Sequence, residues 1–286
     1  MFKLKNKYIC AEISEKGAEI LSLTHNGDEY FFRAATESKK KVGTVKFPLA
    51  LRVNNSNLEI SGQEYKITPS DIAGKSVFSL KKRTKSSVVL ELTENEDTLS
   101  LFPQKFKLQV KYTIFGRSLT AIYKIKNTSQ SDMFFSFSSN NAVFAPNGTE
   151  EYDMIFPLPE KLEKQILKDG LITGNTEKLS DYTKHFALYN SYFGEDKRLY
   201  LGHIKNTKFT VKSRKTGRAF KFIFNGFDNL QIDSIVNPQA IRFGFIYGGA
   251  DSEDSNPTAE NKKCLKKLSK GKSVTLSQKI IIKAGI

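Results

Sequence analysis

Apolar and polar residues alternate with a period of two along much of the chain, which is typical of strands with one buried face. The longest alternating segments are residues 106–114, 118–127, 207–213, 218–224 and 273–283. Glycine-containing turns, IFGRSL at 114–119 and RKTGR at 214–218, separate neighbouring segments. The pattern therefore predicts consecutive antiparallel hairpins.

Helical periodicity is scarce. Residues 162–170 match a short helix, and a second helix is expected between Asn256 and Gly271. There, Asn256 suits the N-cap, Pro257 the first helical position and Gly271 the residue after the C-cap. Neither segment is long enough to form a helical layer over a sheet.

The chain shows no repeat of 20–50 residues and no Pro/Ser/Gly-rich linker. We therefore expect one domain over residues 1–286. Many antiparallel strands with few helices must bury one face of each sheet against another sheet. An all-β protein built as a large sandwich is the simplest architecture, with its functional site in a cleft on one sheet.

Composition fits a large buried core, because 39% of the 286 residues are hydrophobic, with 22 Phe and 11 Tyr. No run approaches the roughly 18 apolar residues of a membrane-spanning helix. The first residues, MFKLKNKYICAEIS, alternate like a strand and lack the apolar centre of a signal peptide. We expect a cytoplasmic protein that does not bind membranes.

Cysteine and histidine are rare. Cys10 and Cys264 cannot build a disulfide framework or a cysteine metal cluster. His25, His185 and His203 have no metal-ligand spacing. We therefore expect neither a metal nor another cofactor.

The formal net charge is +15, which suggests an anionic partner. Lysine supplies 37 of the 45 basic residues, and the best clusters, 39–41 and 81–85, adjoin polar, turn-like stretches. Nucleic-acid sites favour arginine forks on one basic face. We expect no nucleic-acid partner and interpret the charge as a solvated, lysine-rich surface.

One long segment carries a family pattern. Residues 102–144 read FPQKFKLQVKYTIFGRSLTAIYKIKNTSQSDMFFSFSSNNAVF and resemble the galactose mutarotase (aldose 1-epimerase) superfamily. Further matches follow in the family's order at 16–23, 29–32, 47–67, 248–255 and 268–282. The resemblance implies a galactose mutarotase-like β-supersandwich of mainly antiparallel strands. It also implies a small carbohydrate ligand, a hexose or sugar phosphate, and a monomer or homodimer.

The family uses a Glu as general base on the anomeric hydroxyl and a His as general acid on the ring oxygen. The resemblance places Asn140 at the His position and Gly244 at the Glu position, and no carboxylate lies between Arg242 and Asp251. An amide can hydrogen-bond a ring oxygen but cannot supply a proton near pH 7. Both proton-transfer groups are therefore expected to be lost.

Other family positions are partly kept. Arg52 in FPLALR matches an arginine that contacts sugar hydroxyls, whereas Ser70 and Gly74 stand at the His and Arg of the usual HGFAR motif. A salt-bridged surface arginine is an equal alternative for Arg52. For Asn140, a turn at the end of the SFSSNN strand is an alternative to a ligand role.

Two further binding residues depend on less certain matches. The family's binding-site Asp falls on Asn190 in one register, and on Tyr189, Asp196 or Lys197 in others. Tyr247 lies near the expected cleft, where only Tyr or Phe can stack on a sugar because the chain has no Trp. A core position is the alternative for Tyr247.

Three functions stay open at this point. The first is an aldose 1-epimerase-like carbohydrate-binding protein with weak or lost mutarotase activity. The second is an active epimerase in which another group has taken over the chemistry; its candidates are His185, His203, Asp71 and Asp251. The third is a regulatory or structural module that binds an acidic partner through its basic surface.

Overall fold

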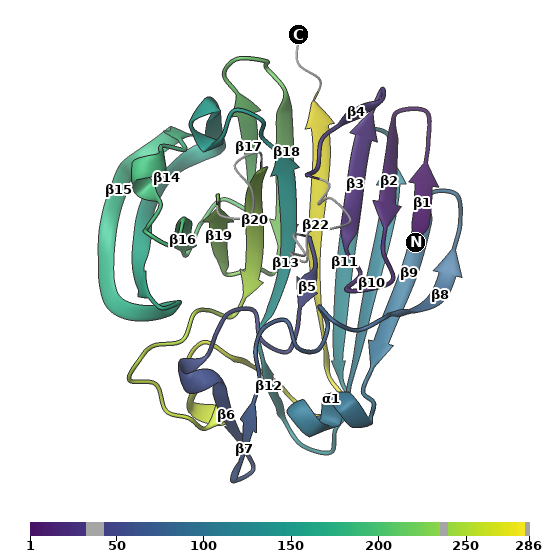
Figure 1. The fold of residues 1–286 in the computed structure, drawn as a ribbon, viewed down its shortest axis with the longest axis vertical. Helices are drawn as coiled ribbons and strands as arrows, with labels where there is room; N and C mark the ends of the chain where they lie inside the picture. The colour runs from purple at the N-terminus through teal and green to yellow at the C-terminus, as the bar shows by residue number, and fades with distance from the viewer. Residues whose placement is uncertain (33–42, 235–239, 284–286) are drawn as a thin grey trace.

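The computed structural model describes residues 1–32, 43–234 and 240–283. Its main feature within these ranges is a 14-stranded antiparallel sheet (Figure 1). In spatial order the strands are β5 (Val45–Lys46), β13 (Phe137–Phe144), β20 (Ala240–Tyr247), β19 (Asn229–Asp233), β16 (Arg198–Gly202), β14 (Tyr152–Lys168), β17 (Lys208–Ser213), β18 (Ala219–Asn225), β22 (Ser273–Lys283), β11 (Ser118–Asn127), β10 (Phe106–Phe115), β9 (Ser87–Thr93) and β8 (Ser79–Arg83), with β15 (Leu171–Ala187) paired to β14.

Smaller elements complete the described chain. The remaining strands are β1 (Phe2–Lys5), β2 (Ile9–Ile13), β3 (Ile20–His25) and β4 (Asp28–Glu29) in one sheet, the hairpin β6 (Asn57–Ile60) and β7 (Gln63–Lys66), and the pair β12 (Met133–Phe135) and β21 (Lys266–Leu268). The helices are α1 (Glu96–Leu101) and the 3-10 turns η1 (Asn54–Ser56), η2 (Thr149–Glu151), η3 (Asn190–Tyr192) and η4 (Ala259–Asn261). The prediction of an all-β protein with mainly antiparallel strands is confirmed.

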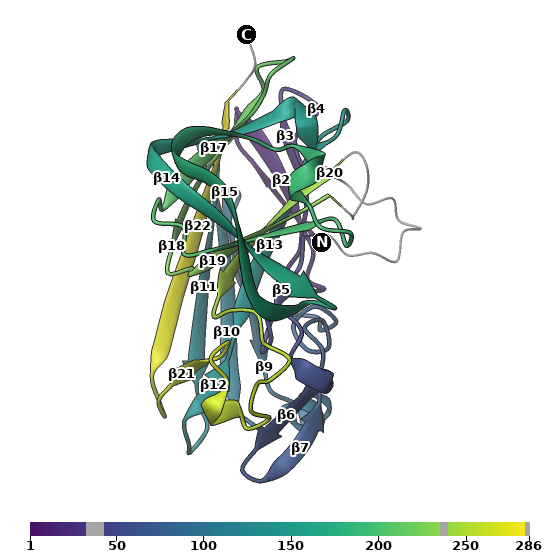
Figure 2. The same cartoon turned by 90° about the vertical axis from the view of Figure 1, so that its left-hand side faces the viewer.

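The large sheet curves so that its two halves face each other (Figure 2). The ring of Phe209 on β17 lies 5.9 Å from that of Phe243 and 6.1 Å from that of Phe245, both on β20. The Oη of Tyr123 on β11 lies 2.5 Å from the Oγ of Ser139 on β13. Because side chains alternate along a strand, the neighbours of Phe243 and Phe245 on β20 face away from this core.

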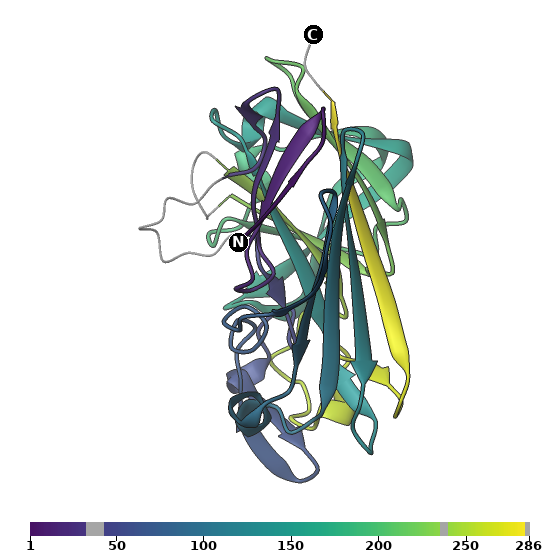
Figure 3. The same ribbon diagram turned by 90° about the vertical axis from the view of Figure 1, so that its right-hand side faces the viewer.

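The N-terminal sheet lies over one side of the large sheet, seen at the left of Figure 3 in purple. A hydrogen bond joins the N-terminal sheet to β10, because the Oη of Tyr112 donates to the backbone oxygen of Ala18 at 2.7 Å. The core cluster extends from Phe2 to Ile282. Both ends of the described chain therefore contribute to the same core.

The helix expected at 162–170 is wrong, because residues up to Lys168 belong to β14. This strand forms a long hairpin with β15, in which Lys168 pairs with Leu171. Asp169 and Gly170 form the turn, with φ of 51° and 80°. An Asp-Gly pair with positive φ is the preferred two-residue hairpin turn. Pairing with β15 therefore outweighs the local helical pattern.

The helix expected between Asn256 and Gly271 is also wrong. The Oδ1 of Asn256 accepts a hydrogen bond from the Thr258 backbone nitrogen at 2.8 Å, but only the turn η4 follows. The chain then enters β21, which pairs with β12. Gly271, with φ of 73°, lies in the turn before β22 instead of ending a helix. Non-local strand pairing again decides the conformation.

One short helix was missed. Helix α1 begins after Asn95, whose Oδ1 accepts from the Thr98 backbone nitrogen at 2.8 Å, while the Thr98 Oγ1 accepts from the Asn95 backbone nitrogen at 2.8 Å. This reciprocal capping satisfies two backbone donors of the first turn. The helix has six residues, too few for periodicity to reveal it.

Candidate functional site

An open cleft of about 790 Å³ lies on the face of β20, β19 and β16 that points away from the aromatic core. Lys46, Arg198, Gln231 and Arg242 contribute side chains from the sheet. The rim consists of Leu51, Arg52, Pro69, residues 166–170 at the β14–β15 turn, and residues 194–196. The volume is within the roughly 300–1,000 Å³ range of small-molecule sites.

Strand register brings the two predicted proton-transfer positions together. Asn140 of β13 pairs with Gly244 of β20, which in turn pairs with Gln231 of β19. Directly opposed residues of an antiparallel pair point to the same side of the sheet. A Cβ atom placed on Gly244 would lie 2.9 Å from the Oδ1 of Asn140. The two positions are therefore in direct contact in the sheet beneath the cleft.

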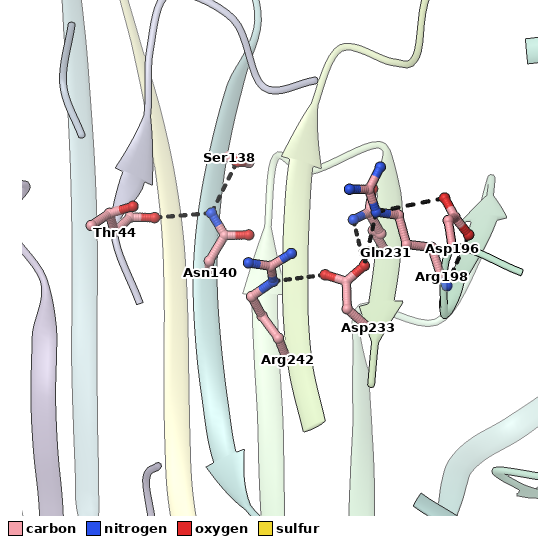
Figure 4. Close-up of polar contacts among 8 residues, drawn as sticks. All are labelled: Thr44, Ser138, Asn140, Asp196, Arg198, Gln231, Asp233 and Arg242. Atoms are coloured by element: carbon pink, nitrogen blue, oxygen red, sulfur yellow. Dashed lines mark hydrogen bonds and ion pairs between the residues drawn. The ribbon is translucent and has the colours of Figure 1, made fainter. Parts of the chain in front are cut away.

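Asn140 lies within β13, so the interpretation of a turn is wrong. Its Nδ2 donates to the backbone oxygen of Thr44 at 2.9 Å and to the Oγ of Ser138 at 3.3 Å (Figure 4). The side chain is only 7% exposed. These two hydrogen bonds hold the amide with its Oδ1 toward Gly244.

The next row of the same face is charged. Asp233 is 1% exposed and accepts hydrogen bonds from the Nε of Arg242 and the Nε2 of Gln231, both at 2.7 Å. The Nε of Arg198 lies 3.8 Å from the same carboxylate and 3.6 Å from that of Asp196 (Figure 4). One buried carboxylate therefore lies between two guanidinium groups that also line the cleft.

Lys46 adds a third positive charge. It pairs with Ser138 across β5 and β13, so its side chain shares the face of Asn140. No Asp or Glu of the described residues lies within ion-pair distance of its Nζ. Burial lowers the pKa of Lys46 to about 8, repulsion from Arg242 and Arg198 adds to the effect, and Asp233 partly offsets it.

Two other predicted binding residues lie at or near the rim. Arg52 is exposed, lines the cleft, and donates from Nη1 to the backbone oxygen of Asp169 at 2.9 Å. Ser70 is exposed and follows Pro69, which lines the cleft. Arg52 thus lines the cleft and Ser70 lies beside it, whereas the buried Asn140 is not among the lining residues.

The structure places Tyr247 and Asn190 elsewhere. Tyr247 lies on the core face of β20, with its ring 5.7 Å from that of Phe135 and 5.6 Å from the Nζ of Lys266. Asn190 accepts a hydrogen bond from the Oγ1 of Thr149 at 2.7 Å, in the turn η3. Among the other registers considered for this position, Asp196 lines the cleft.

The four candidates for displaced catalysis do not line the cleft. His185 is exposed on β15, and Asp71 accepts a hydrogen bond from Lys75 at 2.7 Å. His203 lies in a separate hollow of about 260 Å³, and Asp251 is bound to Lys262 at 2.6 Å. The cleft is instead lined by Lys46, Arg198 and Arg242.

Sequence reasoning missed Lys46, Arg198, Asp233 and Arg242. A signal existed, because each is a charged residue in a strand whose alternate positions are apolar, as in AIRFGFIY at 240–247. Alternation alone assigns such residues to a solvated face. Only the register shows that the four come together. Across residues 1–32, 43–234 and 240–283, no three His, Cys, Asp or Glu side chains are grouped to hold a metal.

Solved structures define the fold. A galactose mutarotase related enzyme from Lactobacillus acidophilus superposes with a TM-score of 0.90 at 21% identity, covering 99% of this chain and 97% of its own. A galactose mutarotase-like protein from Lactobacillus casei superposes with a TM-score of 0.90 at 20% identity, covering 99% of this chain and 100% of its own. A galactose 1-epimerase from Lactobacillus acidophilus superposes with a TM-score of 0.78 at 11% identity, covering 99% of this chain and 94% of its own. The fold is that of the galactose mutarotase-like β-sandwich, as the sequence pattern predicted.

The aldose 1-epimerase family model matches residues 1–153, more than half of the chain, and the protein therefore belongs to this family. Two relatives are the plasmid and chromosomal forms of protein LacX from Lactococcus lactis subsp. lactis. Each is 24% identical over 249 residues, covering 82% of this chain and 83% of its own. Within the described ranges, no helix has the length and apolar character needed to cross a membrane.

Proposed function

We propose that this member of the aldose 1-epimerase family binds a carbohydrate in the cleft and has weak or no mutarotase activity of the Glu/His type. The observation that carries the proposal is the contact between Asn140 and Gly244. The 2.9 Å from a Cβ at 244 to the Oδ1 of Asn140 supports treating them as one pair of substituted positions. Neither residue can transfer a proton near pH 7.

Mutarotation by the family mechanism needs two proton transfers. A base takes the proton of the anomeric hydroxyl while an acid protonates the ring oxygen, so that the bond between C1 and the ring oxygen breaks. Rotation of the C1 aldehyde and reclosure then give the other anomer. General acid and base groups contribute typically 10²–10⁴-fold each. A cleft without either should barely exceed the buffer-catalysed rate.

The cleft retains groups that can hydrogen-bond a sugar. Arg52 has donors beyond the one bound to Asp169. Gln231 lines the cleft, and its Oε1 has no hydrogen-bond partner among the described residues. Ile166 and Leu167 on the rim supply apolar surface for the C–H faces of a ring.

Polarimetry of freshly dissolved α-glucose and α-galactose tests the catalytic half of the proposal. We expect a rate close to buffer alone, with an active family member run beside it as the positive control. A rate comparable to that control would contradict the proposal and would direct attention to Lys46.

Sugar titration tests the binding half. We expect Arg52→Ala to weaken binding of a hexose or sugar phosphate about tenfold, since a hydrogen bond to a charged group is worth about 1.5–3 kcal/mol. Arg117→Ala, at an exposed position in the β10–β11 turn, is the matched control. Equal effects of the two substitutions would remove Arg52 from the site.

We also propose a cytoplasmic location. Both cysteines are free thiols, Cys10 half-buried and Cys264 buried, and burial raises the pKa of the Cys264 thiol to about 12. Inert, reduced thiols suit a reducing compartment. Fractionation of the native host cell is the direct measurement.

A further inference from the structure

The charge of the sheet beneath the cleft is unbalanced. Lys46, Arg198 and Arg242 supply three cations from three strands, whereas Asp233 is the one carboxylate of the described residues that lies between them. Asp196 lies at the rim, 3.6 Å from Arg198. Buried or half-buried charges are normally paired, because desolvation of a lone charge is costly. An excess of positive charge is therefore left facing the cleft.

Donor groups in the same place are also unused. Arg242 commits its Nε to Asp233. The Nε of Arg198 is buried and lies 3.6 and 3.8 Å from the carboxylates of Asp196 and Asp233, without a hydrogen bond to either. The Nζ of Lys46 has no hydrogen-bond partner within the described part of the chain. A guanidinium offers five donors in a planar fork that matches a phosphate or carboxylate.

The cationic groups lie beside an uncharged row. Asn140, Gly244 and Gln231 form that row. Arg242 lies two residues before Gly244 on β20, whereas Lys46 is paired with Ser138, on the other side of the row. The uncharged row suits sugar hydroxyls, and the cations that flank it suit an anion. A single ligand with both features would satisfy both.

We propose that Lys46, Arg198 and Arg242 form an anion subsite that makes the cleft select sugars carrying a phosphate or carboxylate group over neutral sugars. The inference rests on the proposed function, because it assigns the substrate class of the same cleft. Charge-assisted hydrogen bonds are about twice as strong as neutral ones. Half-buried groups also keep this advantage at physiological salt better than surface lysines do.

Proton uptake on ligand binding is a second property by which the subsite can be recognised. The charged groups that face Lys46 are Arg242 on β20, Asp233 on β19 and Arg198 on β16. An anion among them favours the charged form of the amine, so the pKa of Lys46 rises from about 8 on binding. Binding near pH 8 should therefore take up protons, and affinity should fall as pH rises above 8.

The experiment is isothermal titration calorimetry at pH 7 and fixed ionic strength, with four probes: glucose, glucose 6-phosphate, glucuronate and inorganic phosphate. At least one charged sugar should bind about 10–100-fold more tightly than glucose. Lys46→Met should reduce this preference about tenfold or more, because it removes one of the three cations. Lys111→Met, at an exposed position on β10, is the matched control for the lost charge.

Each outcome bears on the inference. Tight binding of one charged sugar alone supports the subsite and distinguishes phosphate from carboxylate. Equal binding of charged and neutral sugars, or an unchanged preference in Lys46→Met, overturns the subsite and leaves the proposed function standing. Phosphate binding through Lys46 without any sugar binding supports the subsite and contradicts the proposed function. No binding of any probe overturns both.

Folding is controlled separately. Lys46→Gln serves as a second variant with a polar side chain, and each variant is compared at a temperature below its own unfolding transition. Titration at pH 8 in two buffers of different ionisation enthalpy measures the protons taken up. Uptake in the wild type that is absent from the Lys46 variants supports the subsite, whereas equal uptake in both overturns the role of Lys46.

Discussion

Two buried carboxylates, Asp233 in strand β19 and Asp251 in a loop, differ in the number of cations around them. The Oδ2 of Asp251 accepts from the Nζ of Lys262 at 2.6 Å and from the backbone nitrogen of Asn54 at 2.9 Å. Both side chains are buried, with exposed fractions of 2% for Asp251 and 0% for Lys262. Ser255 takes a further hydrogen bond from Lys262 at 2.8 Å. The pair is complete and joins three loops.

Asp233 is equally buried, yet its partners remain open. Arg198 and Arg242 both line the cleft, and Lys46 lies close enough for their charges to depress its pKa. A complete pair needs no further ligand, whereas a surplus of cations beside a cleft is stabilised by one. The comparison teaches that burial of a carboxylate is not itself informative about function. The number of cations around it, and their access to solvent, separates a structural pair from a binding site.

Removing the partner of Asp251 should have the largest effect on stability. Lys262→Met leaves that carboxylate buried and uncompensated, so we expect a loss of about 3–5 kcal/mol in urea denaturation. Hydrogen bonds from Lys262 and Asn54 hold the pKa of Asp251 below its usual value despite the opposing effect of burial. Wild-type stability should therefore fall as pH drops through that pKa. Exposed Lys263→Met is the control, and a loss below about 1 kcal/mol would contradict the comparison.

The second prediction concerns Asp233→Asn. The amide keeps the shape and one acceptor but loses the charge, and both arginines can still reach water through the cleft. We expect a loss of about 2 kcal/mol, smaller than for Lys262→Met. Binding of an anionic sugar should become tighter, because one competing negative charge is gone. Weaker binding in a variant that still folds cooperatively would count against the subsite; Asp254→Asn is the exposed control.

Lys46→Met should increase the free energy of unfolding, whereas the two substitutions above should decrease it. Its folded pKa of about 8 lies below the usual 10.5, so the folded state binds this proton less well than the unfolded state does. Wild-type stability should therefore rise between pH 8 and 10.5, and should lack that contribution below pH 8. We expect the substitution to stabilise the protein by on the order of 1 kcal/mol at pH 7. The gain should shrink above pH 8, and a destabilised variant at pH 7 would show that Lys46 is a structural residue.

The smallest effect is expected for Gly244→Ala. Its Cβ would lie 2.9 Å from the Oδ1 of Asn140, whose amide is held by two hydrogen bonds. Moving that amide should cost up to about 1 kcal/mol. A double-mutant cycle with Asn140→Ala measures the contact directly. Additive changes would mean that the two positions do not meet.

Much of the fold was predictable because strand alternation is a local property. The segment 118–127 coincides with β11, and 273–283 with β22. The helix expected at 162–170 failed because the Asp169-Gly170 turn and the pairing of β14 with β15 outweigh a weak helical period. The turn chemistry was visible in the sequence, but its partner strand was not.

The site residues were likewise only partly predictable from local sequence. Family motifs led to Arg52, which lines the cleft, and to Asn140 and Gly244, which are paired in the sheet beneath it. Tyr247 was assigned from its place in the motif, but it lies on the opposite face, because one position along a strand reverses the direction of the side chain. A local motif therefore predicts the strand on which a residue lies more reliably than the face of the sheet to which its side chain points.

The sequence by itself determined the all-β class and the antiparallel hairpins. Each of these depends on residue identity or on neighbours in the chain. Only the tertiary structure decided that Lys46, Arg198 and Arg242 come together around Asp233. These residues lie on β5, β16, β20 and β19, and their contact depends on the order and register of strands far apart in the chain. Register is set by burial of the whole sheet, which no single segment encodes.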